Sequence, residues 1–529
     1  MDEELRAPFR CLESSYMQKK AYTSLGLVEP VQRELGQTLK RRGKRFKLCS
    51  EYAYDIPLEK SLQQLLSNSS IFDQVMSGHC QNDNLFEDYC DGSIFKNHLL
   101  FSVNPTALQV MLYYDDLEIC NPIGSRAKKH KIGVFYYILG NIPPKWRSSL
   151  KVIQLVTIVR HSLIHEYGID KILQPFMESI KKFEKAEGVD LNINGQQHNF
   201  RGTITIVCAD NLASWSLGGY KALASALRKC RFCMAIAEDM SSKFLSEEFQ
   251  PRTRITHANH VTHLAGPLHD HIATTYGIVR DSILNQSQFF HVTEGLAPDI
   301  MHDILEGALQ YETKELLIYV TQERRLISLS FLNQQIESFP YGYCDSSNKP
   351  SIITLTSHDH SLKQSATQMW CLARLLPLLV GEFIPVGEPH WENFLLLLTI
   401  VEYVFGPVTS EDVVPYLKDL IREHHENFCQ LYPNASIIPK IHYIIHLPEW
   451  LLNFGPASRY LCMRFEAKHS YFKSLAHRIK CFKNIEKTLA EHHQNLMCYY
   501  SICDYYVFRE WTFGRTKLVL IVYCTCMFV

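Results

Sequence analysis

The stretch ALQVMLYYDDLEICNPIG, residues 107–124, decides the fold class that the sequence predicts. Eight mostly apolar residues suited to a β-strand end at Asp115 and Asp116, and an Asn-Pro pair then marks a turn. Two further runs rich in β-branched and aromatic residues follow closely, at 132–142 and 150–159. Strands separated by such short turns are typical of an antiparallel meander, so we expect one here.

The elements predicted after the meander complete a familiar order. Apolar residues at helical spacing predict a helix over 166–186, and the run 200–210 predicts a fourth strand that again ends in an aspartate, Asp210. Strand signal is weak over 211–455, and the later part of 459–479 predicts another helix. Three strands, a helix, a strand and then helices is the order of an RNase H-like core. We therefore expect an α/β fold in which an RNase H-like core (three-stranded antiparallel meander, further strands and flanking helices) is interrupted by a large, mostly helical insertion.

The predicted elements divide the chain into five parts. These are an N-terminal helical and loop region (1–103), the first part of the core (104–210), the helical insertion (211–455), a helix region carrying Glu466 (456–510) and an atypical apolar tail (511–529). The apolar run of 12 residues in the tail is shorter than the roughly 20 that cross a membrane, so we expect no membrane span. The tail favours a truncated or misjoined gene product, with a short buried strand as the alternative.

The composition indicates a globular protein without an overall basic coat. Hydrophobic residues make up 46% of the chain, and 54 basic residues nearly balance 55 acidic ones. The longest basic patch is KRRGKRFK at 40–47, for which a solvated loop, a DNA-backbone contact and a nuclear address all remain open. The 17 scattered cysteines and the lack of an apolar leader favour a reducing compartment, the cytosol or the nucleus.

Three carboxylates occupy the places where an RNase H-like core would bring acidic groups together. They are Asp115 after the first strand, Asp210 after the fourth and Glu466 on the late helix. Such a cluster suits phosphodiester cleavage, in which two Mg²⁺ or Mn²⁺ ions stabilise the attacking and leaving oxygens. A single aspartate after a strand is more often a turn residue or helix cap, so the interpretation depends on all three.

Cys230 and Cys233 form a CxxC pair, which is half of a tetrahedral zinc site. Two downstream histidines or aspartates would complete it, although surface or core residues are the plainer interpretation of each. The candidates are His257, His260, His263, His269, His271, Asp299, His302 and Asp303. We expect His442 and His446, in an apolar run, to be buried and hydrogen-bonded instead.

The helix around Glu466 adds two lysines to the predicted site. Glu466 and His469 are three residues apart and share a helical face. Lys468 and Lys473 lie elsewhere on the helix and could contact a phosphate backbone. An ordinary amphipathic helix is the alternative. The chain lacks a GxxxxGK[ST] loop, which argues against ATP-driven work.

Eight motifs in order give the chain a resemblance to a known family. They are YDDLEICNPIGS, HK at 130–131, CADNLASWSLGG, CRFC, RTRITH, DIMHDILEG, PKIHYIIH and RFEAKHSYFK. Together, over about residues 8–500, they resemble the transposases of CACTA-type (En/Spm-like) DNA transposons in their animal form. No single motif is decisive, and the order of all eight makes the match fairly specific.

The resemblance implies a DDE transposase that cuts and pastes DNA in the nucleus. It implies that Asp115, Asp210 and Glu466 form the triad and bind two Mg²⁺ or Mn²⁺ ions, with Asp116 dispensable. It also implies a structural Zn²⁺ on Cys230, Cys233, His257 and His302, with Asp299 as a substitute oxygen ligand. The implied partners are the transposon's terminal repeats, target DNA and further copies of the chain.

The chain also departs from this family. Such transposases commonly have more sequence before this start and continue well beyond the glutamate helix. A truncated or inactive relic therefore stays open. Two further alternatives are a non-enzymatic DNA- or chromatin-binding protein derived from a transposase, and an RNase H-like nuclease without strand transfer.

Overall fold

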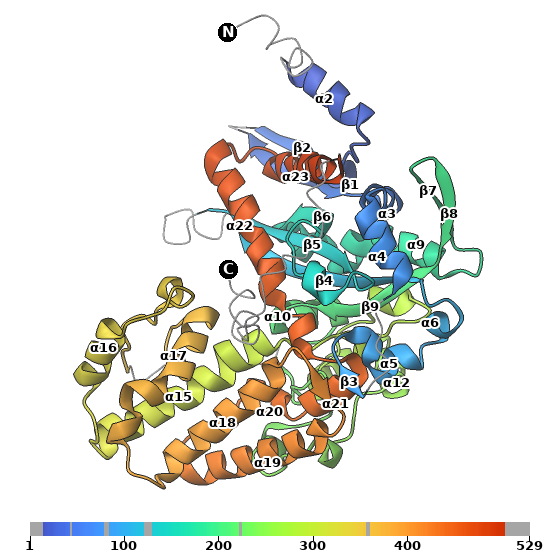
Figure 1. The fold of residues 1–529 in the computed structure, drawn as a ribbon. Helices are drawn as coiled ribbons and strands as arrows, with labels where there is room; N and C mark the ends of the chain where they lie inside the picture. Colours follow the sequence, from blue (N-terminus) through green and yellow to red (C-terminus); the bar gives the residue numbers. More distant parts are fainter. Residues whose placement is uncertain are drawn as a thin grey trace, which may run out of the picture.

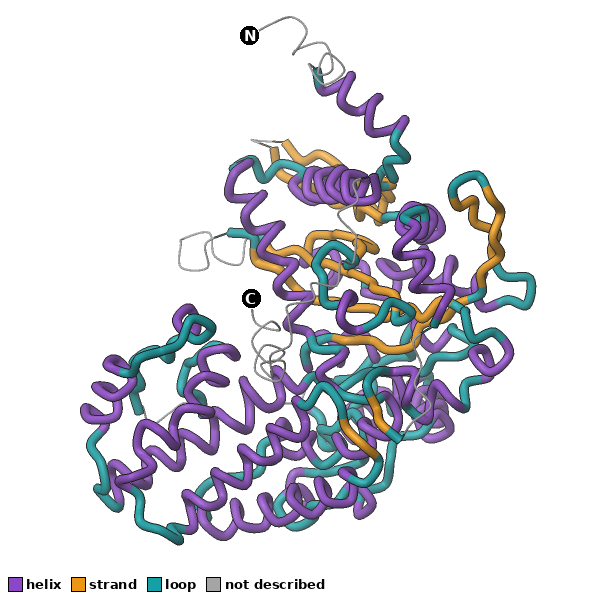
Figure 2. Tube along the Cα trace, in the orientation of Figure 1, coloured by secondary structure: helices purple, strands orange, loops and turns teal. Residues whose placement is uncertain are grey.

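The computed structural model of the 529-residue chain describes residues 14–42, 45–78, 84–120, 130–221, 225–355 and 360–502. The predicted turn at 121–124 and the apolar tail at 511–529 lie outside these ranges. In Figure 1 a twisted sheet occupies the upper part of the molecule, and a large group of helices lies below it; Figure 2 shows the same division by secondary structure. Within the described ranges, no helix combines the length and the apolar character needed to cross a membrane.

A mixed six-stranded sheet, in the order β1-β2-β6-β5-β4-β9, organises the upper part. Its strands are β1 (Val31–Arg42), β2 (Arg45–Asp55), β4 (Leu108–Glu118), β5 (Lys131–Leu139), β6 (Gln154–Arg160) and β9 (Gly202–Cys208). The strands β4, β5 and β6 pair antiparallel in sequence order, which confirms the predicted meander. Only β9 runs parallel to its neighbour, β4. The α/β class is therefore confirmed.

The apolar character of β4 follows from its central position, because side chains on both of its faces are buried. Leu112 and Tyr114 face a core shared with α3 (Leu58–Leu66), α8 (His161–Tyr167) and α9 (Ile169–Glu184). Met111 and Tyr113 face the opposite core, shared with α22 (Cys462–Ile479). The helix α23 (Ile485–Ile502) follows α22 and packs against β6 and β2. Successive residues of β4 therefore pack against different helices.

The sheet has one feature that the sequence did not predict. Residues 1–103 were expected to be helical or irregular, yet the long β1–β2 hairpin lies within them and extends the sheet beyond β6. The sequence of β1, VQRELGQTLKRR, is mostly polar and lacks the alternation of a half-buried strand. Pairing within the hairpin, and not burial, therefore stabilises its outer part.

The region between β9 and α22 is mostly helical in its described residues, as predicted. Its main helices are α10 (Asn211–Gly218), α12 (Arg254–Leu264), α13 (His269–Tyr276), α15 (Leu309–Ile318), α16 (Leu329–Ser338), α17 (Ala366–Val380), α18 (Pro389–Phe405), α19 (Val413–Leu431), α20 (Pro439–Ile444) and α21 (Leu447–Phe454). A π-helical stretch, η6 (Met301–Ala308), precedes α15. The strand β10 (Thr409–Ser410) pairs with β3 (Leu85–Phe86), which ties this region to the N-terminal part. A separate hairpin, β7 (Val189–Ile193) and β8 (Gln196–Phe200), precedes β9.

Candidate functional site

The two predicted aspartates leave the sheet at the same end of adjacent strands. Tyr113 of β4 is the register partner of Cys208 of β9, and these strands are parallel. Asp115 and Asp210 each lie two residues further along; Asp210 follows the end of β9, whereas Asp115 lies within the last part of β4, which continues to Glu118 instead of ending before Asp115 as predicted. Asp210 is also the N-cap of α10, where its Oδ1 accepts a hydrogen bond from the Ala213 amide at 2.6 Å. Capping fixes the direction of the Asp210 side chain.

The helix α22 brings Glu466 to the same end of the sheet. Its Phe465 ring stacks on Tyr113 of β4, with centroids 4.4 Å apart. One turn further, His469 Nδ1 lies 3.6 Å from Asp115 Oδ2. Because Glu466 is flanked by these two contacts, α22 holds it close to the aspartates. The structure therefore places the three predicted carboxylates at the same end of the sheet, although they are not among the groups of described residues whose ligand atoms lie within 4.8 Å of one another.

The pKa values of Asp115 and Glu466 reflect burial and neighbouring acidic groups. Burial raises the pKa of Asp115 to about 6, and the negative charge of Asp210 adds to the rise. Burial also raises the pKa of Glu466 to about 7; His302 opposes this rise and Asp115 adds to it. Neighbouring carboxylates repel one another when all are ionised. A divalent cation between them would remove the repulsion.

Asp116 points away from this cluster, as alternation along a strand requires. Its Oδ1 accepts a hydrogen bond from the Tyr114 hydroxyl at 3.0 Å and lies 2.8 Å from His161 Nδ1. Its Oδ2 lies 3.2 Å from Lys131 Nζ. Although burial opposes it, His161 and Lys131 lower the pKa of Asp116. The neighbouring aspartates thus have separate surroundings, and only Asp115 faces α22.

The sequence did not predict that His302 would contact Glu466. His302 lies on η6, and its Nδ1 is 2.5 Å from Asp299 Oδ2 while its Nε2 is 3.6 Å from Glu466 Oε1. Burial favours neutral His302, but the Asp299 carboxylate outweighs it and raises the histidine pKa to about 10. Asp299 is itself fixed by the Cys462 amide, which donates to its Oδ1 at 3.2 Å. A protonated His302 therefore links Asp299 to Glu466 and fixes the orientation of the glutamate.

Four buried side chains form a second cluster that could hold a metal ion. They are Cys230 and Cys233, His442 of α20 and His446 before α21, and their donor atoms lie within 4.8 Å of one another. Cys233 Sγ is 3.3 Å from His442 Nε2, and Cys230 Sγ is 3.6 Å from His446 Nε2. Around one tetrahedral Zn²⁺ with ordinary bond lengths, sulfur and nitrogen ligands stand about 3.5 Å apart. The four residues therefore fit zinc.

Without a metal, the cluster favours a thiolate on Cys230 only, because burial and the neighbouring Cys230 raise the pKa of Cys233. Burial opposes ionisation of Cys230, but the Cys233 thiol and the two imidazoles outweigh burial and lower the Cys230 pKa well below that of an ordinary thiol. Burial lowers the pKa of His442, which keeps its ring neutral and able to ligate. Arg252 fixes the backbone beside the first cysteine by donating from Nε to the Cys230 carbonyl at 2.9 Å.

The expected third and fourth zinc ligands need correction. His257 is buried beside His291 and Tyr220, and His302 lies beside Glu466, so neither belongs to the cysteine cluster. The sequence did hold a signal for the true partners, because His442 and His446 have the H-x₃-H spacing of zinc-binding histidines. This spacing was not recognised as a zinc signal because the two histidines lie in an apolar run and are far from the cysteines along the chain.

One of the two predicted phosphate contacts also needs correction. Lys468 is buried, and its Nζ donates a hydrogen bond to the Leu150 carbonyl at 2.8 Å. Burial lowers the Lys468 pKa to about 7. Lys473 is exposed, as a phosphate contact would need to be. Helical spacing alone could not distinguish the two, because the Lys468 face of α22 is covered by the loop before β6.

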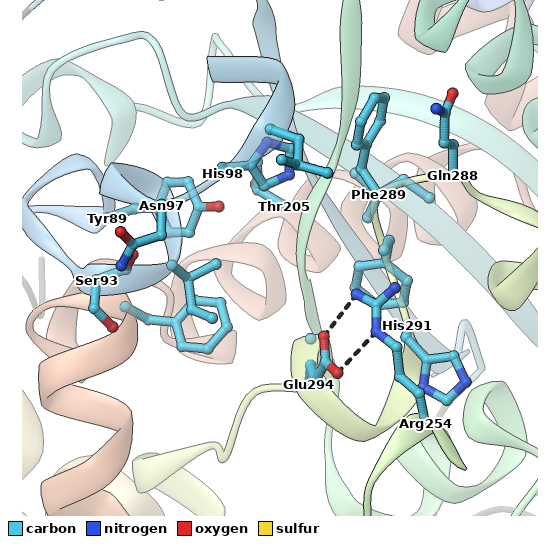
Figure 3. A pocket seen from close by; sticks show the side chains of 16 residues that line it. Tyr89, Ser93, Asn97, His98, Thr205, Arg254, Gln288, Phe289, His291 and Glu294 are labelled. Carbon is cyan, nitrogen blue, oxygen red and sulfur yellow. Dashed lines mark hydrogen bonds and ion pairs between the residues drawn. The ribbon is translucent and has the colours of Figure 1, made fainter. Parts of the chain in front are cut away.

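A cavity of about 280 Å³ lies apart from both clusters (Figure 3). Aromatic and polar side chains line it, among them His98, Phe289 and Arg254. Arg254 is already engaged in a two-pronged ion pair with Glu294, with distances of 2.8 and 2.6 Å. Because its arginine is neutralised, the cavity offers no special attraction for an anionic ligand.

No family model matches the chain, and no curated protein matches it either. The geometry of the two clusters is therefore the basis for a functional proposal.

Proposed function

We propose that the protein is a divalent-metal-dependent DNA strand transferase of the DDE transposase type, built on an RNase H-like core. The observation that carries this proposal is the meeting of Asp115, Asp210 and Glu466 at one end of the sheet, where burial and like charge raise the pKa values of Asp115 and Glu466. The strand order β6-β5-β4-β9 supports it, because an RNase H-like core needs three antiparallel strands with the fourth parallel to the first.

The three carboxylates would act as oxygen ligands of two Mg²⁺ or Mn²⁺ ions. When bound, the ions would supply the positive charge that activates a water or a 3′-hydroxyl and stabilises the leaving oxygen. Asp210 is oriented by its capping bond and Glu466 by His302, so two of the ligands are held before any ion arrives. His469 lies on the Asp115 side of α22, where its neutral ring can help orient that aspartate.

A structural Zn²⁺ on Cys230, Cys233, His442 and His446 would complete the fold of the helical region. These ligands join the loop after α10 to α20 and α21, which directly precede α22. Zinc would thereby fix the start of the helix that carries Glu466. Its role would be structural, since all four ligands are buried and leave no open coordination position.

The proposed substrates are the terminal repeats of a transposon and a target duplex. After hydrolysis at the element's end, the freed 3′-hydroxyl would attack target DNA. The nucleus is the proposed location, and a homo-oligomer is the proposed active form, because two transposon ends must be joined.

The test is Mg²⁺- or Mn²⁺-dependent nicking and strand transfer on DNA carrying the element's terminal repeats. Wild type should nick and join, and Asp210→Asn should do neither. Asp116→Asn is the matched control, because Asp116 belongs to the other face of β4. Equal cleavage by wild type and Asp210→Asn would refute the mechanism. Nicking without joining would indicate a nuclease, and metal-independent DNA binding without cleavage would indicate a transposase-derived binding protein.

A further inference from the structure

The outer half of the β1–β2 hairpin carries the chain's longest basic stretch, KRRGKRFK at 40–47. The strand β2 pairs with β6 only through Ala53–Asp55, so the residues nearer the hairpin tip form a two-stranded ribbon that the sheet does not continue. Figure 1 shows β1 and β2 in the upper part of the molecule, below α2 and beside α23. The described residues of the basic stretch, 40–42 and 45–47, therefore belong to strands and lie outside the core.

The register of the ribbon separates its side chains into two faces. Lys40 pairs with Lys47, and these positions lie on one face together with Arg45. The pair next to Lys40 and Lys47 on the side away from the tip, Leu39 and Leu48, lies on the other face, and both side chains are about 60% exposed. The second face also carries the pair Arg41 and Phe46, and the Phe46 side chain is 65% accessible. One face is thus basic, and the other combines three exposed apolar groups with Arg41.

The ribbon extends past the carboxylate end of the sheet. The end of β4 that carries Asp115 pairs with the start of β5, and the start of β5 pairs with the end of β6 at Arg160. Because β2 is antiparallel to β6, its early residues continue beyond Arg160 in the same direction. The basic tip therefore lies on the side of the sheet from which Asp115 and Asp210 emerge.

The segment after α22 adds basic groups at the same end. The Phe482 ring contacts His130, directly before β5, with centroids 4.5 Å apart. Arg160 lies 3.7 Å from Glu51 of β2 and 3.1 Å from Glu486 of α23, which connects the ribbon with this segment. The exposed basic residues of α22 and the segment that follows it are Lys473, Arg478, Lys480 and Lys483.

Most of these cations are available to an outside anion. Lys40 is paired with Glu51. In contrast, the structure gives Arg45, Lys47, Lys473, Lys480 and Lys483 no carboxylate partner among the residues that it describes. The whole chain has a net charge of only -1, so this concentration of positive charge at one end is local.

We propose that the β1–β2 ribbon and the segment after α22 form a binding surface for duplex DNA that leads to the carboxylate site. The unpaired cations would contact phosphates, and Leu39, Phe46 and Leu48 would lie against the sugar edges of a groove. A second copy of the chain fits less well, because it would bring the same positive charges together. The part of this proposal in which the bound DNA leads to the carboxylates rests on the proposed function. DNA binding by the ribbon does not depend on catalysis.

The test measures binding of the full-length protein to a labelled duplex over a range of salt concentrations, without divalent metal. Arg45→Glu with Lys47→Glu should weaken binding at least about tenfold at moderate salt and reduce the salt slope by about two. Lys60→Glu with Lys185→Glu, which changes two exposed lysines outside this surface by the same charge, should bind like wild type. Matching thermal unfolding of both variants would show that the fold is intact.

Two further variants separate the possible outcomes. Leu39→Ser with Leu48→Ser should weaken binding with little change in salt slope; an altered oligomeric state with unchanged DNA binding would instead make this face a subunit contact and overturn the proposal. Unchanged affinity and slope in the Arg45 and Lys47 variant would also overturn it. Cleavage by Asp210→Asn in Mg²⁺ would refute the proposed function, whereas the binding surface is judged only by the metal-free affinity of the Arg45 and Lys47 variant, so the two proposals fail separately.

Discussion

The carboxylate site and the Cys/His cluster differ in how much of each solvent can reach. The Asp115 and Glu466 side chains remain 20% and 35% exposed, whereas Cys230 and Cys233 are each 1% exposed. Both clusters join segments far apart in the sequence. The first combines hard oxygen donors that repel one another, and the second combines sulfur and nitrogen donors at tetrahedral spacing. Under the proposed function, the first would be an exchangeable Mg²⁺ or Mn²⁺ site and the second a permanent zinc site.

The largest expected effect is on catalysis. Asp115→Asn or Glu466→Gln should lower strand cleavage by about 10³-fold or more, because the amide can coordinate but cannot neutralise two divalent ions. The measurement is single-turnover nicking in Mg²⁺, with Asp116→Asn as the control. Loss of activity in the control equal to that in Asp115→Asn would show that the two neighbouring aspartates do not divide their roles as described.

Loss of a zinc ligand should come next, and it should act on the fold. Cys233→Ser or His446→Ala should remove zinc and lower the free energy of unfolding by about 3 to 5 kcal/mol. Metal content and thermal unfolding measure this effect. His257→Ala should keep a full complement of zinc, because that histidine lies outside the cluster. Unchanged zinc in the cysteine variant would disprove the site.

Removal of the histidine that holds Glu466 should have an intermediate effect on the carboxylate site alone. His302→Gln should lower the cleavage rate about tenfold and increase the Mg²⁺ concentration needed for half-maximal rate, because Glu466 loses its orientation. Zinc content should not change. If His302→Gln loses zinc but keeps its Mg²⁺ dependence, the histidine belongs to the other cluster.

The smallest expected effect is on the pH dependence of folding stability in the absence of divalent metal. Burial and Asp210 raise the folded-state pKa of Asp115 to about 6, against an ordinary value of 3.8. Between these values the folded protein binds a proton more tightly than the unfolded chain, so stability falls as pH rises from about 4 to 7. Asp115→Asn removes this loss and should be about 1 to 3 kcal/mol more stable at pH 8.

This stability difference is measured by chemical unfolding in the presence of a chelator. It should shrink towards zero near pH 4, where the wild-type carboxyl is protonated in the folded protein. Added Mg²⁺ should stabilise wild type more than the variant. A variant that is less stable than wild type at pH 8 would contradict the buried, repelling environment assigned to Asp115.

Much of the fold could be predicted because its signals are local. All four strands predicted from the sequence overlap observed strands, because continuous apolar runs mark strands that are buried on both faces. The predicted ranges were 107–114, 132–142, 150–159 and 200–210. The hairpin β1–β2 could not be predicted in this way, because its outer residues are exposed and their pattern carries no burial signal.

The sequence by itself determined which residue types were present and the elements that carry them: two aspartates after strands, a glutamate on a helix and a CxxC pair. Only the tertiary structure decided their partners. It brought His442 and His446 to the cysteines, His302 to Glu466 and the basic ribbon to the carboxylate end of the sheet. Periodicity indicates which residues of one element share a face. The partners in a metal site or an ion pair are determined by packing between segments that are distant in sequence.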